Sequence, residues 1–137
     1  MQTSHVPAGM KILIVEDDVD LVETYTDLLE PQGYNVISVL RAADAIQAAT
    51  RQKPHLIILD LNLPGDSGGL VLNFVRRYPP IAKTRIVIVT GQPDMINSNL
   101  YVADKADAIL TKPIANQKLL ETINSLLGEQ SQTGSRQ

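Results

Sequence analysis

The residues with the clearest chemical potential are carboxylates that close apolar runs. Glu16 and Asp17 follow the run KILIV, and Asp60 ends the run HLIILD. If these acids meet, two of their charges about 4 Å apart repel by roughly 4 kcal/mol at an effective dielectric near 20. Such a cluster favours a divalent cation or protonation. The sequence has no cysteine and no histidine motif, so oxygen atoms are the available ligands. Oxygen ligands suit Mg²⁺, which readily shares its coordination shell with phosphate oxygens.

A hydroxyl and an ammonium group occupy corresponding positions farther along the chain. Thr90 follows the run RIVIV, and Lys112 follows ADAILT. Carboxylates with a metal on one side and these two groups on the other suit a transferring phosphoryl group, because its equatorial oxygens carry the charge. Asp60 is therefore the predicted nucleophile.

The candidate residues coincide with the ends of predicted secondary-structure elements. Apolar, β-branched runs predict strands at 11–15, 34–39, 55–60, 85–91 and 106–110. Helical spacing predicts helices at 19–30, 43–52, 70–77 and 93–101, and a final helix marked by Leu119, Ile123 and Leu126.

This alternation predicts an α/β fold of the flavodoxin-like, doubly wound (βα)5 type. Right-handed crossovers place helices on both faces of a parallel sheet, here with the expected strand order 2-1-3-4-5. The first and third strands then flank the topological switch point, where ligands bind beyond the carboxyl ends of the strands. The fold therefore predicts that the acids share one pocket.

Length and composition bear on the number of domains, on nucleic-acid binding and on membrane spans. The 137 residues fit one domain, expected at 10–128, between polar tails expected to be flexible at 1–9 and 129–137. A net charge of −3 gives no electrostatic signature of nucleic-acid binding. The sequence has no long apolar run and no signal-like N-terminus, so we expect a cytoplasmic protein without a membrane span.

Each candidate residue has an ordinary interpretation when taken alone. Asp17 and Asp18 could cap a helix, and we expect Asp18 to do so. Asp60 could begin a turn, Thr90 could be a plain strand residue, and Lys112 a solvated charge. Their joint placement at adjacent strand ends favours the phosphoryl site instead.

Four motifs together resemble the receiver domain of two-component response regulators, over about residues 10 to 128. They are ILIVEDD, LIILDLNLPGDSG, VIVTG and LTKP, which stand in the family's order. The resemblance implies that Asp60 takes phosphate from a sensor histidine kinase or a histidine phosphotransfer protein. It also implies that such a domain is not an enzyme for an external substrate and catalyses only its own phosphorylation and dephosphorylation.

The resemblance assigns further roles around Asp60. It implies that Asp17 and Asp60 ligate Mg²⁺, that the backbone carbonyl of Asn62 is another ligand, and that Glu16 acts through bound water. Thr90 and Lys112 would bind phosphoryl oxygens, with Gly91 beside Thr90 in the switch region. The peptide bond between Lys112 and Pro113 would be cis.

One position departs from the family pattern. Receivers commonly carry an aromatic residue three positions before the Lys-Pro pair, where Ile109 stands here. Ile has a stiff χ1 and no polar tip, so we expect signalling to depend on backbone movement near Thr90 and Gly91. Asn62 and Gln92 resemble residues that orient water for autodephosphorylation.

Partners and rival functions complete these expectations. The resemblance implies two kinds of partner: a phosphodonor protein, and either a downstream target or a missing output domain. The target or output domain would contact the face formed by helix four, strand five and helix five. A homodimer through this face is also possible. One alternative is a haloacid-dehalogenase-like phosphatase, although Asn62 stands where those enzymes place their general acid. The other is a pseudo-receiver that serves only as a docking module.

Overall fold

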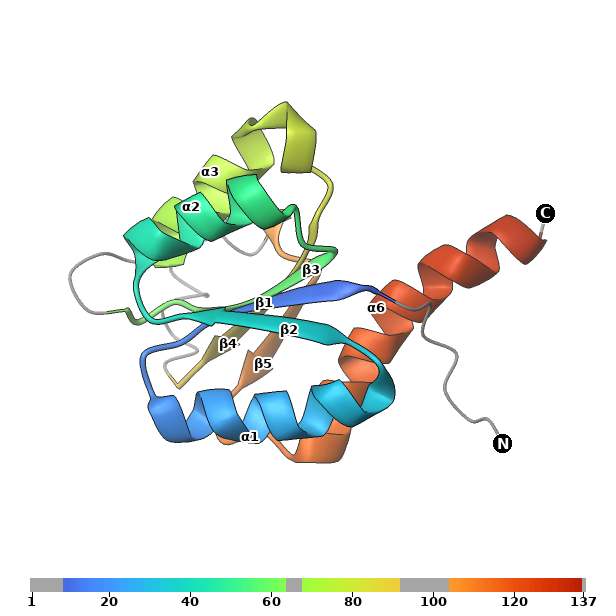
Figure 1. Cartoon of the computed structure of the whole chain (residues 1–137), viewed down its shortest axis with the longest axis horizontal. Coiled ribbons are helices and arrows are strands. Elements are labelled where there is room, and N and C mark those ends of the chain that lie inside the picture. The colour runs from blue at the N-terminus through green and yellow to red at the C-terminus, as the bar shows by residue number, and fades with distance from the viewer. Residues whose placement is uncertain (1–8, 64–67, 92–103, 137) are drawn as a thin grey trace.

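The computed structural model describes residues 9–63, 68–91 and 104–136 (Figure 1). Its centre is a parallel sheet in the order β2-β1-β3-β4-β5, which is the predicted order. The strands are β1 (Lys11–Val15), β2 (Asn35–Val39), β3 (Leu56–Asp60), β4 (Arg85–Thr90) and β5 (Ala108–Thr111).

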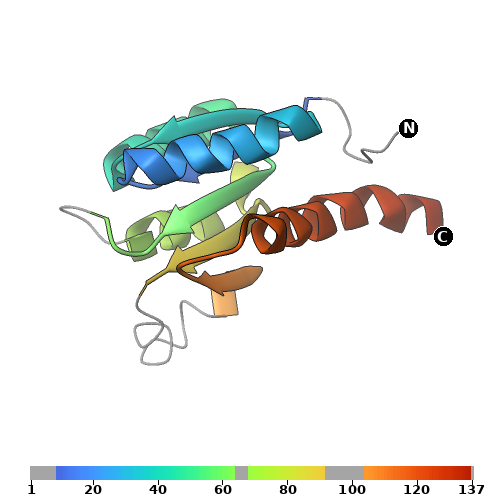
Figure 2. The ribbon, with the colours of Figure 1, turned by 90° about the horizontal axis from the view of Figure 1, so that it is seen from below.

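The helices cover both faces of the sheet, as Figures 1 and 2 show. One face carries α1 (Val19–Leu29) and α6 (Asn116–Arg136), and the other carries α2 (Ala42–Gln52) and α3 (Gly68–Arg77). Two short 3-10 turns, η1 (Glu30–Gln32) and η2 (Pro79–Ile81), follow α1 and α3. The architecture is therefore the flavodoxin-like, doubly wound sandwich that the sequence predicts.

The central strands are apolar because both of their faces are covered. All five residues of β3 are buried, and only the first residue of β1 and of β4 is partly exposed. Alternate side chains enter two separate clusters. Leu13, Ile57 and Ile88 belong to the cluster under α2 and α3, whereas Ile12 and Ile58 belong to the cluster with α1 and α6.

The strand register brings the candidate residues to one edge of the sheet. In β1 and β3, Val15 lies opposite Leu59, so the residue after each lies near the same level. Asp60 lies opposite Val89 and Thr90 lies opposite Thr111. The ends of β1, β3, β4 and β5 thus meet at the carboxyl-terminal edge, as parallel pairing requires.

Asp18 starts α1 and is the predicted N-cap. Its Oδ1 accepts hydrogen bonds from the backbone N–H groups of Asp20 (3.0 Å) and Leu21 (3.3 Å). The cap satisfies donors that have no partner inside the helix. The capping role falls to Asp18, and its neighbour Asp17 stays exposed at the sheet edge.

The last strand and the last helix differ from the predicted bounds. β5 begins at Ala108, two residues later than expected, and just before it Asp107 bonds to Ile86 twice: its backbone N–H donates to the Ile86 carbonyl, and its side chain accepts the Ile86 N–H (both 2.8 Å). The predicted C-terminal tail begins after Gly128, but α6 continues to Arg136. Helical hydrogen bonds are local, so a helix anchored by buried turns continues into polar sequence.

Some expectations lie outside the described residues. They are the helix at 93–101, Gln92, and the tail at residues 1–8. The flexibility of 129–137 stays a prediction. Within the part of the chain that is described, no helix is long and apolar enough to cross a membrane.

Candidate functional site

Three carboxylates meet at the carboxyl-terminal edge of β1 and β3. One oxygen from each of Glu16, Asp17 and Asp60 lies within 4.8 Å of the others. Glu16 and Asp60 are only 2% and 3% exposed, while Asp17 is exposed. The site therefore joins two buried acids to one that faces solvent.

Glu16 is held at both of its carboxylate oxygens. Its Oε1 lies 2.9 Å from the Nζ of Lys112, and its Oε2 accepts the backbone N–H of Asp18 at 3.1 Å. Burial raises the pKa of Glu16 above its ordinary value, and the hydrogen bonds from Lys112 and Asp18 only partly oppose this. The nearby charge of Asp60 raises that pKa further.

Asp60 has a different partner at each oxygen. Its Oδ1 accepts the backbone N–H of Asn62 at 2.9 Å, and its Oδ2 lies 3.4 Å from the Nζ of Lys112. A carboxylate oxygen has more than one lone pair, so each can take a further ligand. The carboxylate is thus oriented by its surroundings and still able to bind a cation or react.

Lys112 is shared by the two buried acids. Burial lowers the pKa of its ammonium, but the hydrogen bond that it donates to Glu16 and the charge of Asp60 outweigh burial, and the net pKa is raised. The Lys112 backbone N–H donates to the carbonyl of Thr90 (2.8 Å), and the peptide bond to Pro113 is cis. The side chain therefore remains a cation beside Asp60 at neutral pH.

The donor set fits Mg²⁺ better than a softer metal. The clustered groups are all carboxylates, and one ammonium opposes three negative charges. Such hard oxygen ligands suit Mg²⁺. Asp17 is the exposed acid of the three and is open to a hydrated ion, and the Oδ2 of Asp60 lies farther from the Nζ of Lys112 (3.4 Å) than the Oε1 of Glu16 does (2.9 Å).

The remaining predicted residues lie along β4 and β5. Thr90 is fully buried at the end of β4, and the Cβ position of Gly91 has open space around it. Ile109 lies opposite Ile88 and packs, partly buried, against the cluster under α2 and α3. The structure thus places Thr90 and Lys112 at the edge that holds the acids, and Ile109 inside the sheet-helix layer.

Gly68 is a positioning residue that the sequence analysis missed. A Cβ atom on Gly68 would lie 2.4 Å from the carbonyl oxygen of Asp60 and 2.9 Å from the Cα of Leu61. Its N–H donates to the carbonyl of Leu61 at 3.0 Å. The start of α3 therefore rests directly on the backbone of Asp60 and Leu61. The Gly68-Gly69 pair was the available signal, because paired glycines often mark a close backbone approach.

A hollow of about 410 Å³ opens beside Lys112. It lies between the first turns of α1 and the segment after β5, and its apolar walls include Leu21, Pro113 and Ile114. Thr24 and Tyr25 line it as well. A side chain from another molecule can approach Lys112 from this direction.

Sheet order and strand-end acids together define a doubly wound domain with an acidic, lysine-containing pocket at the switch point. A comparison with known protein families assigns the chain to one of them. Residues 12–124 match the family model of the response regulator receiver domain. The chain therefore belongs to the response regulator receiver family of two-component systems.

Individual relatives agree with this assignment. The chain is 33% identical over 119 residues to the transcriptional regulatory protein GltR of Pseudomonas aeruginosa, covering 87% of this chain and 49% of that protein. It is 28% identical to the polar-differentiation response regulator DivK of Brucella anthropi, covering 86% and 96% of the two chains. GltR is thus matched over about half of its length.

Solved structures show the same fold. The receiver domain protein (CheY-like) of Methanospirillum hungatei superposes with a TM-score of 0.82 at 28% identity, covering 92% of this chain and 99% of that chain. The chemotaxis response regulator CheY4 of Vibrio cholerae gives a TM-score of 0.79 at 25% identity, covering 88% and 100%.

Proposed function

We propose that this receiver domain accepts a phosphoryl group on Asp60 from a phosphohistidine donor, a sensor histidine kinase or a histidine phosphotransfer protein. The observation that carries the proposal is the setting of Asp60. Its carboxylate is buried, oriented by the Asn62 amide and the Lys112 ammonium, and lies beside two further acids.

The proposed transfer is a single displacement at phosphorus. An oxygen of Asp60 forms the new O–P bond while the donor's N–P bond breaks, and the donor imidazole leaves with the electron pair of that bond. Lys112 pairs with a phosphoryl oxygen, and the Thr90 hydroxyl donates to another. Transfer converts the Asp60 carboxylate into an acyl phosphate, which carries more negative charge than the carboxylate did.

We propose Mg²⁺ as the cofactor of this site. Asp17, Asp60 and the carbonyl of Asn62 would hold it, and Glu16 would act through a coordinated water molecule. The ion would neutralise charge on the acids and on the incoming phosphoryl oxygens. The support is the excess of carboxylates over ammonium groups in the cluster.

Autodephosphorylation is the second reaction that we propose. Asn62 follows two residues after Asp60, so its side chain could orient water toward the phosphoryl group, and open space at Gly91 leaves an approach. Gln92 is proposed for the same role from the sequence. We expect the phosphoryl label to decay without a separate phosphatase. A label that persists for many hours would contradict this expectation.

Signal output is proposed to pass through the backbone around Thr90 and Gly91. Ile109 is packed in the layer under α2 and α3 and has no polar tip to expose. Beryllofluoride, a phosphoryl analogue, should therefore shift amide resonances of β5 and α6 as well as those of the pocket. Shifts restricted to the pocket would refute this route. We further propose that the face around β5 and α6 contacts a downstream target or a second copy of the chain, and that the protein is cytoplasmic.

The test of phosphoryl acceptance uses acetyl phosphate as a small donor. Intact-mass spectrometry of the whole chain with acetyl phosphate and Mg²⁺ should show one added phosphoryl group, located on Asp60 by peptide mapping. Asp60→Asn should abolish the added mass, whereas Asp27→Asn, which changes a carboxylate of α1 outside the cluster, should keep it. Labelling of Asp60→Asn to the wild-type extent would refute the assignment.

The same preparation separates the alternative functions. Catalytic hydrolysis of para-nitrophenyl phosphate would indicate a phosphatase, but Asn62 lacks the carboxyl proton that a general acid must supply. A pseudo-receiver would take no label at all.

A further inference from the structure

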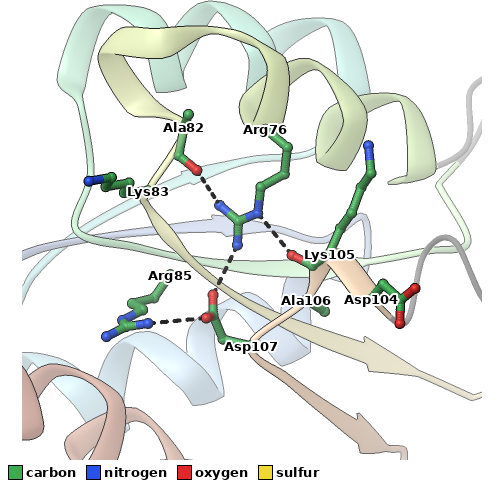
Figure 3. A pocket seen from close by; sticks show the side chains of 8 residues that line it. All are labelled: Arg76, Ala82, Lys83, Arg85, Asp104, Lys105, Ala106 and Asp107. Carbon is green, nitrogen blue, oxygen red and sulfur yellow. Dashed lines mark hydrogen bonds and ion pairs between the residues drawn. The ribbon is translucent and has the colours of Figure 1, made fainter.

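A second charged region lies at the opposite edge of the sheet. Two open hollows of about 760 and 460 Å³ flank the segment between α3 and β4, and they share Arg76, Ala82 and Lys83 in their walls. We name this region the basic groove. Its cations are Arg76, Lys83, Arg85 and Lys105, which Figure 3 shows, and Arg77, which lines the smaller hollow.

One carboxylate in the groove serves two guanidinium groups. Asp107 Oδ2 lies 2.9 Å from Arg76, and its Oδ1 lies 3.2 Å from Arg85. Figure 3 shows Asp107 between the two arginines, and its Oδ2 also accepts the backbone N–H of Ile86 at 2.8 Å. The charge of Asp107 is therefore fully engaged within the protein.

Arg76 forms the framework of the groove. Its guanidinium donates to the carbonyl oxygens of Ala82 (3.0 Å), Lys105 (2.9 Å) and Thr84 as well as to Asp107. These bonds tie the end of α3 to the starts of β4 and β5. Arg76 thus contributes positive charge at a fixed place.

The groove has an excess of positive charge. Arg77 and Lys83 are exposed, and among the described residues that line the two hollows there are five cations and two carboxylates, those of Asp104 and Asp107. Like charges held together raise the local potential and favour a ligand of the opposite sign. An excess of negative charge favours a cation at the acidic site, and the excess of positive charge in the groove likewise favours an anion.

We propose that the basic groove binds an acidic polypeptide segment of a partner protein. Carboxylates spaced along an extended segment can meet cations that line two adjoining hollows. Binding should not depend on phosphorylation, because none of the groove residues belongs to the acidic cluster at Asp60.

The groove suits a peptide better than a compact phosphate or a nucleic acid. Compact phosphate sites use converging backbone N–H groups at a helix N-terminus, whereas α3 ends here and the carbonyl oxygens of Ala82, Thr84 and Lys105 face Arg76. Single-stranded nucleic acids stack on aromatic side chains, and none of the described residues that line the two hollows is aromatic.

Fluorescence anisotropy with the full chain tests this proposal. The probe is a labelled decaglutamate peptide, with a decaglutamine peptide as the neutral control, at low and high salt. We expect saturable, salt-sensitive binding of decaglutamate only. The Arg77→Glu/Lys83→Glu double variant should weaken it about tenfold or more, because two attractive charges become repulsive; tenfold corresponds to about 1.4 kcal/mol.

Two variants make the result specific. Lys118→Glu/Arg41→Glu reverses two exposed charges outside the groove and should leave the affinity within about twofold. Asp60→Asn should bind like the unmodified chain, so failure of phosphoryl acceptance and failure of this proposal are distinguishable. Circular dichroism checks that each variant is folded.

Four outcomes would overturn the proposal. They are no binding of decaglutamate, equal losses in the two double variants, tighter binding of a labelled oligothymidine, and displacement of the peptide by inorganic phosphate but not by chloride at matched ionic strength. The third would indicate a nucleic acid and the fourth a compact anion.

Discussion

The two edges of the sheet carry opposite arrangements of charge. At the carboxyl-terminal edge one ammonium, that of Lys112, is shared by the carboxylates of Glu16 and Asp60. At the amino-terminal edge one carboxylate, that of Asp107, is shared by the guanidinium groups of Arg76 and Arg85. Each edge therefore retains charge of the majority sign after its internal pairs have formed.

Helix dipoles and local side chains together set the sign of the charge at each edge of the sheet. In a parallel sheet with covering helices, helix N-termini and C-termini collect at opposite edges, and their dipoles favour acids at one and bases at the other. Asp20 lies in the first turn of α1, and Arg76 and Arg77 lie in the last turn of α3. The helix dipoles thus agree with both charge patterns, and local side chains decide how much charge is left for a ligand.

The largest effect is expected from removing the shared carboxylate at the basic edge. Asp107→Asn leaves Arg76 and Arg85 without their counterion, so the free energy of unfolding should fall by about 2 to 3 kcal/mol. Urea denaturation measures the loss. Asp104→Asn, which removes an exposed carboxylate from the same hollow, is the matched control. Equal stability of the two variants would show that the Asp107 pairs contribute little.

A smaller loss of stability is expected at the acidic edge from Gly68→Ala. The new methyl group would contact backbone atoms of Asp60 and Leu61, which cannot rotate away, so the variant should lose about 2 kcal/mol and accept phosphate more slowly. Gly128→Ala adds the same methyl group to α6 in open space and should be neutral or slightly stabilising. Wild-type labelling rates in Gly68→Ala would contradict the positioning role.

The smallest effect is the response of the acidic edge to Mg²⁺ and pH. The raised pKa of Glu16 means that its favourable contribution to folding is present at low pH and is lost as pH rises through that pKa. Above that pH the cluster is charged, and Mg²⁺ at ten times its Kd should raise the free energy of unfolding by about 1.4 kcal/mol. This corresponds to a rise of about 4 °C in Tm.

Thermal melts with Mg²⁺ and with EDTA across the acid-to-neutral range measure this gain. Binding of Mg²⁺ at the acids requires the gain to grow as pH increases. Asp17→Asn should reduce it, while Asp104→Asn should not. A gain that is constant with pH, or largest in acid, would place the ion elsewhere.

The sequence predicted the parts of the molecule that follow from local pattern and from parallel topology. Buried strands ending in acids indicated the sheet order and the meeting of Glu16, Asp17 and Asp60, because parallel strands end at a common edge. The Asp18 cap was equally readable, since capping depends on residues only two or three positions away.

The features that the sequence did not reveal are tertiary. The contact of Gly68 with the Asp60 backbone depends on how α3 settles on the sheet. The pairing of Asp107 with Arg76 and Arg85 joins residues 31 and 22 positions apart, and no spacing rule relates them. The continuation of α6 past Gly128 was not predicted, because the residues that follow are polar and were expected to form a tail.

The opposite charges of the two edges also make the molecule an electric dipole. A charged partner is turned by this field before contact, and a negatively charged one meets the basic edge more often than chance allows. Such steering changes the rate of encounter more than the lifetime of the complex, and added salt suppresses it. The exposed positions of Arg77 and Lys83 would therefore influence how fast an acidic partner arrives as well as how tightly the basic groove holds it.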